Sequence, residues 1–199
     1  MQAQGTPFIG LLYVGLALTS TGPKVVEFNV RFGDPETEPL LSLLESPLAS
    51  IMLAAAQADL SAIDGLRFRP EYAVGVVLAS EGYPRAPITG RPITGLMNQD
   101  ADVLHAGTRL DGDQLVTSGG RVLVVLGHGE TLAGARQEAY QNISEIQLDG
   151  GFHRDDIAAA AAVQEALAGL ASGNSSHETP RHATATPEEP SYRNNPSTN

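Results

Sequence analysis

The most informative absences in this chain of 199 residues are those of cysteine and lysine. Without any cysteine, neither a disulfide framework nor a thiolate metal site can form. Lysine and arginine together number 12 against 23 aspartates and glutamates, which gives a formal net charge of −11, and Lys24 is the only lysine. A nucleic-acid-binding surface needs a clustered basic patch, so we expect no nucleic-acid partner.

Long apolar runs are also scarce. The run from Phe8 to Leu18 is too short to cross a bilayer. Lys24, the first basic side chain, follows the run, whereas the basic region of a signal peptide precedes its apolar core. We therefore expect no membrane segment, a cytoplasmic protein, and a buried strand at this position.

Residues 24–32 alternate between apolar and polar side chains, which is typical of a half-buried strand. The apolar positions, which we expect to face inward, are Val26, Phe28, Val30 and Phe32. The other face aligns the carboxylate of Glu27, the amide of Asn29 and the guanidinium of Arg31, with neighbours roughly 6.5–7 Å apart. Carboxylate and amide oxygens are ligands that Mg²⁺ takes beside phosphates, and an arginine holds a phosphoryl or carboxylate group by two hydrogen bonds. An edge strand with a solvated polar face would show the same pattern.

The flanking segments predict a hairpin followed by two helices. The apolar strands 8–19 and 24–32 are joined by a cluster of turn residues, which favours an antiparallel hairpin. After the break at Gly33-Asp34-Pro35, leucines recur at helical spacing from Leu40, with Pro39 in the first turn. The alanine- and leucine-rich residues 48–60 predict a second helix.

From about residue 67 the sequence becomes rich in glycine and in short β-type runs. Thr131 is suited to cap a helix that continues to about Ile146. Residues 152–157 predict a short strand or extended segment, and residues 158–170 a further helix. The strands expected before these are 72–79, 93–96, 103–110, 114–117 and 121–126.

Glu27-x-Asn29-x-Arg31 resembles the metal-binding strand of ATP-grasp ligases. The longer run from Glu27 to Glu36, Glu-Phe-Asn-Val-Arg-Phe-Gly-Asp-Pro-Glu, resembles the signature of the phosphoribosylamine–glycine ligase family. Further stretches similar to that family, in the same order, are residues 5–13, 79–84, 105–108 and 119–123. The resemblance extends over about residues 5–157.

The resemblance implies an α+β fold in three parts. Residues 1–62 would form the C-terminal part of an ATP-grasp domain, a β-hairpin plus helices. Residues 63–171 would form a small β-rich C-terminal domain with one helix, from whose usual ending the expected helix 158–170 departs. Residues 172–199 lack apolar periodicity and are expected to be disordered.

The same resemblance implies roles for four residues. Glu27 and Asn29 would hold Mg²⁺, or Mn²⁺, that bridges the phosphates of ATP. Arg31 would stabilise the transferred phosphoryl group or the glycyl phosphate, unless it forms an ion pair with Glu36 or Asp34. Asp34 would orient substrate, or else cap the helix that follows Pro35.

Three further polar residues have no assigned role. Arg121 follows Gly119-Gly120 and can either reach an anionic substrate or be an exposed hairpin arginine, the interpretation that we slightly favour. His105 is interpreted as packed or hydrogen-bonded rather than catalytic. The role of His153 does not follow from the sequence.

In the resembled family, glycine is activated by ATP as an acyl phosphate and attacked by the amine of 5-phosphoribosylamine, a step of purine synthesis. The family enzyme is longer, with an N-terminal domain and a nucleotide-clamping lobe, so we expect this chain to be a C-terminal portion that is inactive alone. A truncated gene, a split gene with the missing lobe in trans, or a late start would each explain this. Two alternatives remain open: a non-catalytic remnant or interaction module, and another ATP-grasp carboxylate–amine ligase.

Overall fold

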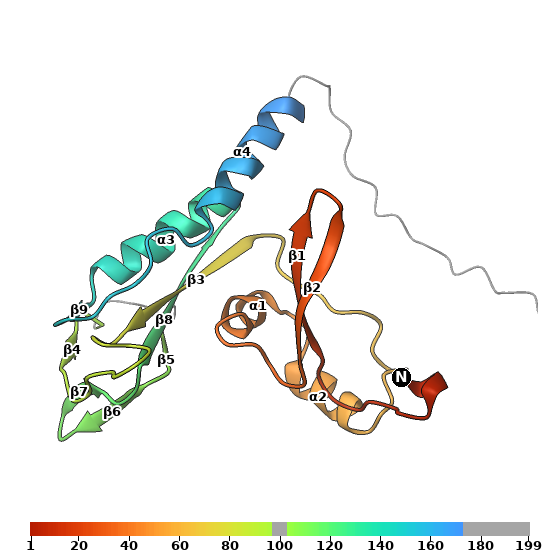
Figure 1. Cartoon of the computed structure of the whole chain (residues 1–199), viewed down its shortest axis with the longest axis horizontal. Coiled ribbons are helices and arrows are strands. Elements are labelled where there is room, and N and C mark those ends of the chain that lie inside the picture. The colour runs from red at the N-terminus through yellow and green to blue at the C-terminus, as the bar shows by residue number, and fades with distance from the viewer. Residues whose placement is uncertain (97–102, 173–199) are drawn as a thin grey trace, which may run out of the picture.

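The structure, a computed structural model, describes residues 1–96 and 103–172 and confirms the expected α+β class (Figure 1). The N-terminal elements are the 3₁₀ turn η1 (Gln2–Gln4), β1 (Tyr13–Thr19), β2 (Gly22–Asn29), α1 (Thr37–Leu43) and α2 (Leu48–Ala56). The later elements are β3 (Tyr72–Ala79), β4 (Ile93–Thr94), β5 (Val103–His105), β6 (Thr108–Asp111), β7 (Gln114–Thr117), β8 (Arg121–Gly129), α3 (Leu132–Ser144), β9 (Gln147–Leu148) and α4 (Ala159–Ser172).

The core lies in the C-terminal half, where three antiparallel strands in the order β3-β8-β5 are covered by α3. The helix lies so close to β8 that a Cβ at Gly127 would stand 2.2 Å from the backbone nitrogen of Ala139. Glycine is therefore required at this position of the strand. The helix begins as expected, because the Thr131 side chain accepts a hydrogen bond of 3.1 Å from the backbone of Gly134.

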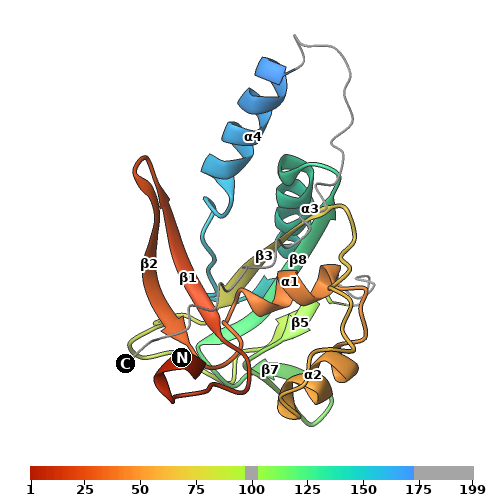
Figure 2. The ribbon, with the colours of Figure 1, turned by 90° about the vertical axis from the view of Figure 1, so that its right-hand side faces the viewer.

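Helix α1 contacts the same sheet through β3 and β8, and Figure 2 shows it beside these strands. A Cβ at Gly75 would stand 3.4 Å both from Pro39 of α1 and from Val124 of β8. Val125, the next residue, belongs instead to the cluster that packs with α3. Because both faces of β8 are covered, its sequence is continuously apolar over residues 122–126 and does not alternate between apolar and polar side chains.

Most expected elements are present, with shifted ends. Strands 72–79 and 114–117 are confirmed to the residue, whereas the expected strand 103–110 is divided into β5 and β6. The division arises at Ala106 and Gly107, whose backbone N–H groups both donate to the carbonyl of Val122. In the expected strand 152–157, Phe152 alone forms a bridge, to Ala79.

The antiparallel hairpin is confirmed, but the expected burial of its apolar face is wrong for all but Phe32, which is half-buried. Val26, Phe28 and Val30 are 69%, 62% and 71% exposed. On β1, Leu16 and Leu18 are exposed as well. The sheet of β1 and β2 has two strands within the described residues, and these exposures show that this face is left uncovered there.

Three further expectations concern a membrane segment, the division into domains and the C-terminal tail. No helix within residues 1–96 and 103–172 is long and apolar enough to cross a membrane. The division at residues 62 and 63 stays a prediction. Residues 173–199 of the expected disordered tail lie outside the described residues.

Candidate functional site

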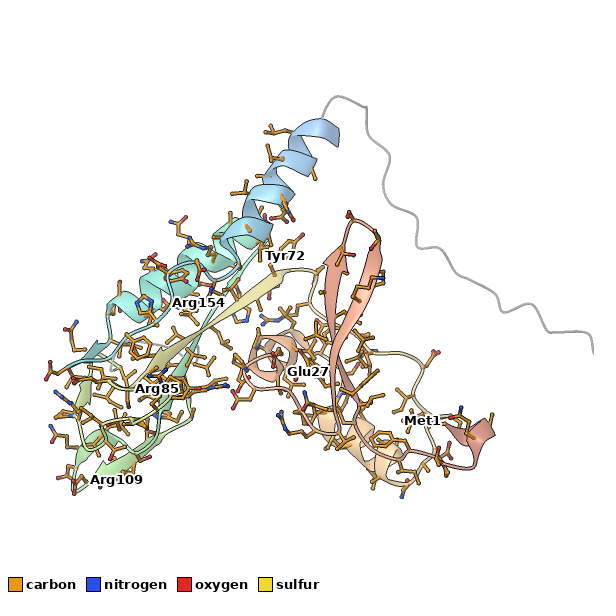
Figure 3. All side chains as sticks on the ribbon, viewed as in Figure 1. Met1, Glu27, Tyr72, Arg85, Arg109 and Arg154 are labelled. Carbon is orange, nitrogen blue, oxygen red and sulfur yellow. The ribbon has the colours of Figure 1, made fainter. Side chains whose placement is uncertain are left out.

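The two expected metal ligands lie on β2 and contact each other. The Asn29 side-chain nitrogen donates to Glu27 Oε1 over 3.0 Å, so both side chains point to the same side of the strand. Both lie at the surface, and Figure 3 shows the labelled Glu27 among the N-terminal elements, far from Arg109 in β6. Since the amide nitrogen of Asn29 faces Glu27, its Oδ1 is the atom left to bind a ligand.

Tyr13 is a neighbour of this pair that the sequence reasoning missed. It stands opposite Asn29 in the register of the hairpin. Partial desolvation, then the nearby carboxylates of Glu36 and Glu27, raise the pKa of the Tyr13 phenol, which also hydrogen-bonds to Glu36. The register of the hairpin shifts between Gly15 and Leu16, so counting back from the turn would not have identified this tyrosine.

Arg31 lies beyond the end of β2, which is shorter than the expected strand. Its guanidinium donates to the carbonyl of Phe32 over 2.7 Å. The alternative of an ion pair with Asp34 or Glu36 is not seen among the described contacts. Arg31 is exposed, and its role toward a phosphoryl group stays a prediction.

Asp34 has a partner far along the chain. Its Oδ1 accepts from Arg121 Nη1 over 2.6 Å, and its backbone carbonyl accepts from the same nitrogen over 2.8 Å. The capping role for Asp34 is wrong, because Glu36 is the N-cap of α1 and forms no side-chain cap bond. An orienting role toward substrate stays a prediction. Arg121, which we expected to be an exposed hairpin arginine, is instead half-buried and paired with Asp34.

A cavity of about 460 Å³ lies beside this ion pair. Its wall is formed by Pro35 from the N-terminal half and by β3, Tyr83 and Arg121 from the C-terminal half. Residues 152–154 close another side. The cavity therefore lies where the two halves of the chain meet.

The donor set of β2 fits a metal that is shared with other ligands. Within residues 1–96 and 103–172, no three His, Cys, Asp or Glu side chains gather closely enough to hold a metal ion. Glu27 and Asn29 together offer hard oxygen atoms of the kind that bind Mg²⁺ alongside phosphate oxygens and water. They fit a metal–nucleotide complex rather than a free-standing metal site.

The two histidines singled out in the sequence are both hydrogen-bonded. His105 Nδ1 is 2.9 Å from the hydroxyl of Thr108, so the expected hydrogen bond is present. His153 Nδ1 is 3.1 Å from the carbonyl of Arg154, and the His153 ring tilts against that of Tyr140. Neither lies with Glu27 and Asn29.

Comparisons with known proteins agree with these two halves. Residues 73–160 match the family described as phosphoribosylglycinamide synthetase, C domain. Residues 1–37, which contain Glu27 and Asn29, match the ATP-grasp (A) domain of the same synthetase.

The relatives that match this chain are phosphoribosylamine–glycine ligases. The phosphoribosylamine–glycine ligase of Streptomyces coelicolor is 54% identical over 168 residues, which is 81% of this chain and 40% of that protein. That of Corynebacterium ammoniagenes is 49% identical, over 81% of this chain and 38% of that protein. The crystal structure of the ligase from Thermotoga maritima matches with a TM-score of 0.64 and 38% identity, over 73% of this chain and 36% of that one. The chain thus spans about two fifths of the length of these relatives.

Proposed function

This chain belongs to the phosphoribosylglycinamide synthetase family over residues 1–37 and 73–160, and we propose on that premise that it is the C-terminal portion of a phosphoribosylamine–glycine ligase. The whole enzyme would join glycine to 5-phosphoribosylamine in de novo purine synthesis, forming a C–N bond at the expense of ATP. The observation that carries the proposal is the contact between Glu27 and Asn29 on one side of β2, inside the segment that matches the ATP-grasp domain.

In the proposed reaction, the carboxylate of glycine attacks the γ-phosphorus of ATP and releases ADP. The amine of 5-phosphoribosylamine then attacks the acyl phosphate, and phosphate leaves as glycinamide ribonucleotide forms. Bound to the phosphates, the metal would neutralise charge during phosphoryl transfer. Glu27 and Asn29 would hold that metal, with Arg31 available at the end of the strand for the transferred group.

We propose that the partner of this chain is the N-terminal portion of the enzyme, which makes up the remaining three fifths of the relatives' length. It would be either covalently joined to this chain or a separate chain. The exposed apolar face of the hairpin, formed by Val26, Phe28 and Val30, supports this assignment. Large exposed apolar side chains that gather on one face are typical of interaction sites. The use of Mg²⁺ or Mn²⁺ by the whole enzyme and its cytoplasmic location are part of the same proposal.

The test is a fusion of the full chain behind the N-terminal portion of the S. coelicolor ligase. We expect the fusion to release ADP over repeated turnovers only when glycine and 5-phosphoribosylamine are both present, and the isolated chain to show no turnover. Release of ADP with a different carboxylate and amine would favour another ATP-grasp ligase. Turnover by the isolated chain would contradict the proposal of a portion that needs its partner.

Within this fusion, Glu27→Gln removes one charge from the proposed metal site while keeping the shape of the side chain. We expect turnover to fall roughly 100-fold and to recover in part at high Mg²⁺. Glu45→Gln, at an exposed carboxylate between α1 and α2, is the matched control and should leave turnover unchanged. Equal activity and equal Mg²⁺ dependence in both variants would show that Glu27 is a solvated strand residue.

A non-catalytic interaction module is the second candidate, and the exposed hairpin face is the observation that favours it. Such a module would bind the N-terminal portion in trans without restoring turnover. Glu27→Gln would then change neither binding nor any activity. Measuring binding and ADP release on the same mixtures separates the two candidates.

A further inference from the structure

One arginine connects the two halves of the chain that match different domains. Arg121 begins β8, and its Nη1 donates to both the carboxylate and the backbone carbonyl of Asp34. Its Nε donates to the hydroxyl of Tyr83 over 2.9 Å. The guanidinium therefore binds both the backbone and the side chain of Asp34. Its third hydrogen bond, to Tyr83, restrains the guanidinium itself.

The two glycines that precede Arg121 are fixed to the C-terminal sheet. A Cβ at Gly120 would stand 2.3 Å from the ring of Tyr83, so the ring lies directly against this glycine. Ser80, which is buried, donates from its hydroxyl to the carbonyl of Gly119 over 2.8 Å. The backbone N–H of Ser80 donates to the carbonyl of Gly120, also over 2.8 Å. The contacts of Gly119, Gly120 and Tyr83 within the C-terminal half thus orient the Arg121 side chain independently of Asp34.

At the other end, the contact acts on the turn that terminates the proposed metal strand. This turn, Gly33-Asp34-Pro35, separates the end of β2 from the start of α1. The N–H of Thr37 donates to the carbonyl of Gly33, which ties the turn to the helix. Fixing Asp34 therefore restrains the segment between β2 and α1, in addition to the packing of α1 on β3 and β8.

We propose that Arg121, supported by Tyr83, is a positioning residue that sets the metal-binding strand against the C-terminal domain through the turn at Asp34. The inference rests on the proposed function, because it is through Glu27 and Asn29 that the position of the strand matters to catalysis. Reactant placement is a large part of the rate in phosphoryl-transfer enzymes, and small displacements lower it strongly.

The surroundings of the arginine agree with this role. The hydrogen bond to Tyr83 raises the pKa of Arg121, partial desolvation opposes the rise, and Asp34 adds to it. The side chains of Arg121 and Asp34 are 36% and 61% exposed. Exposed ion pairs add little to stability, so the consequence of losing this one should appear in the reaction and in local mobility rather than in global unfolding.

The first experiment measures kcat/KM in the fused full-length enzyme. Arg121→Met should lower it about tenfold and raise the Mg²⁺ concentration needed for half-maximal rate, with a small change in melting temperature. Tyr83→Phe should act in the same direction and less strongly. Arg121→Lys, which can still reach Asp34, should recover part of the loss. Arg91→Met is the matched control, because Arg91 pairs with Glu81 and Asp149 inside the C-terminal half.

The second experiment needs no activity. Hydrogen exchange on the full chain should show faster exchange at residues 33–37 in Arg121→Met and none of this change in Arg91→Met. Faster exchange together with lower kcat/KM supports the proposal. Unchanged exchange overturns the proposal. If unchanged exchange is accompanied by a raised KM for one substrate, Arg121 is a substrate contact. Faster exchange with unchanged kcat/KM overturns it in favour of a structural ion pair. An inactive unsubstituted fusion would defeat the proposed function, while the exchange data still decide whether Arg121 anchors the turn.

Discussion

Strands β2 and β8 are both rich in apolar side chains, yet they lie in opposite surroundings. On β8, every residue from Val122 to Leu126 is buried. On β2, Val25, Val26 and Phe28 are all more than half exposed. The two strands differ in their neighbours, because β8 lies between two strands with helices α1 and α3 over the sheet.

This contrast separates two kinds of information in an apolar pattern. Periodicity reports which side chains share a face of a strand. It does not report whether another element exists to cover that face. Stability in the described residues should therefore depend strongly on β8 and weakly on the hairpin, whereas the proposed chemistry depends on the hairpin.

The largest effect is expected from Val125→Asp. Val125 has 0% exposure in the centre of β8, so the substitution would bury an unpaired carboxylate. We expect the free energy of unfolding to fall by about 4 kcal/mol or more, measured by urea unfolding of the full chain. A variant that unfolds cooperatively within about 1 kcal/mol of the parent would contradict the burial of this strand.

Gly127→Ala tests the contact between β8 and α3 with a single methyl group. That methyl would overlap the backbone of Ala135 and Ala139, so the helix would have to move. We expect a loss of about 3 kcal/mol in the same unfolding measurement. Gly169→Ala in α4, with nothing within 4 Å of the new Cβ, is the control. It should raise stability by about 0.5–1 kcal/mol, because alanine is a better helix former.

Thr131→Ala removes the cap of α3 and leaves its packing on β8 unchanged. The lost hydrogen bond to Gly134 should lower the free energy of unfolding by about 1 kcal/mol. Thr131→Ser retains the acceptor oxygen and should retain most of the stability. If both variants unfold at the same urea concentration, the side-chain cap is not a significant part of the helix–sheet unit.

The smallest effect is expected from Val26→Asp, which places the same aspartate on the exposed strand. In the isolated chain we expect a change within about 0.5 kcal/mol, because Val26 is 69% exposed rather than facing inward as the strand pattern predicted. In the fusion with the N-terminal portion, the same substitution should lower the melting temperature, since the proposed partner covers this face. Equal effects in both contexts would remove the support for that partner surface.

The sequence by itself determined the local features of this protein. It determined the hairpin, the strands 72–79 and 114–117, the cap at Thr131, and the placement of Glu27 and Asn29 on one face. These follow from backbone periodicity and short-range hydrogen bonds, which a stretch of about ten residues specifies. The run from Glu27 to Glu36 also carried the resemblance to one family, through the identity and order of its residues.

Only the tertiary structure decided which partners distant residues find. Asp34 and Arg121 are separated by 87 positions, and no local pattern indicates that they pair. The division between β5 and β6 depends likewise on the carbonyl of Val122, which lies on another strand. The exposure of Val26 and Phe28 depends on which elements lie next to the hairpin. Burial and long-range pairing are properties of packed neighbours, and a chain acquires its neighbours only when it folds.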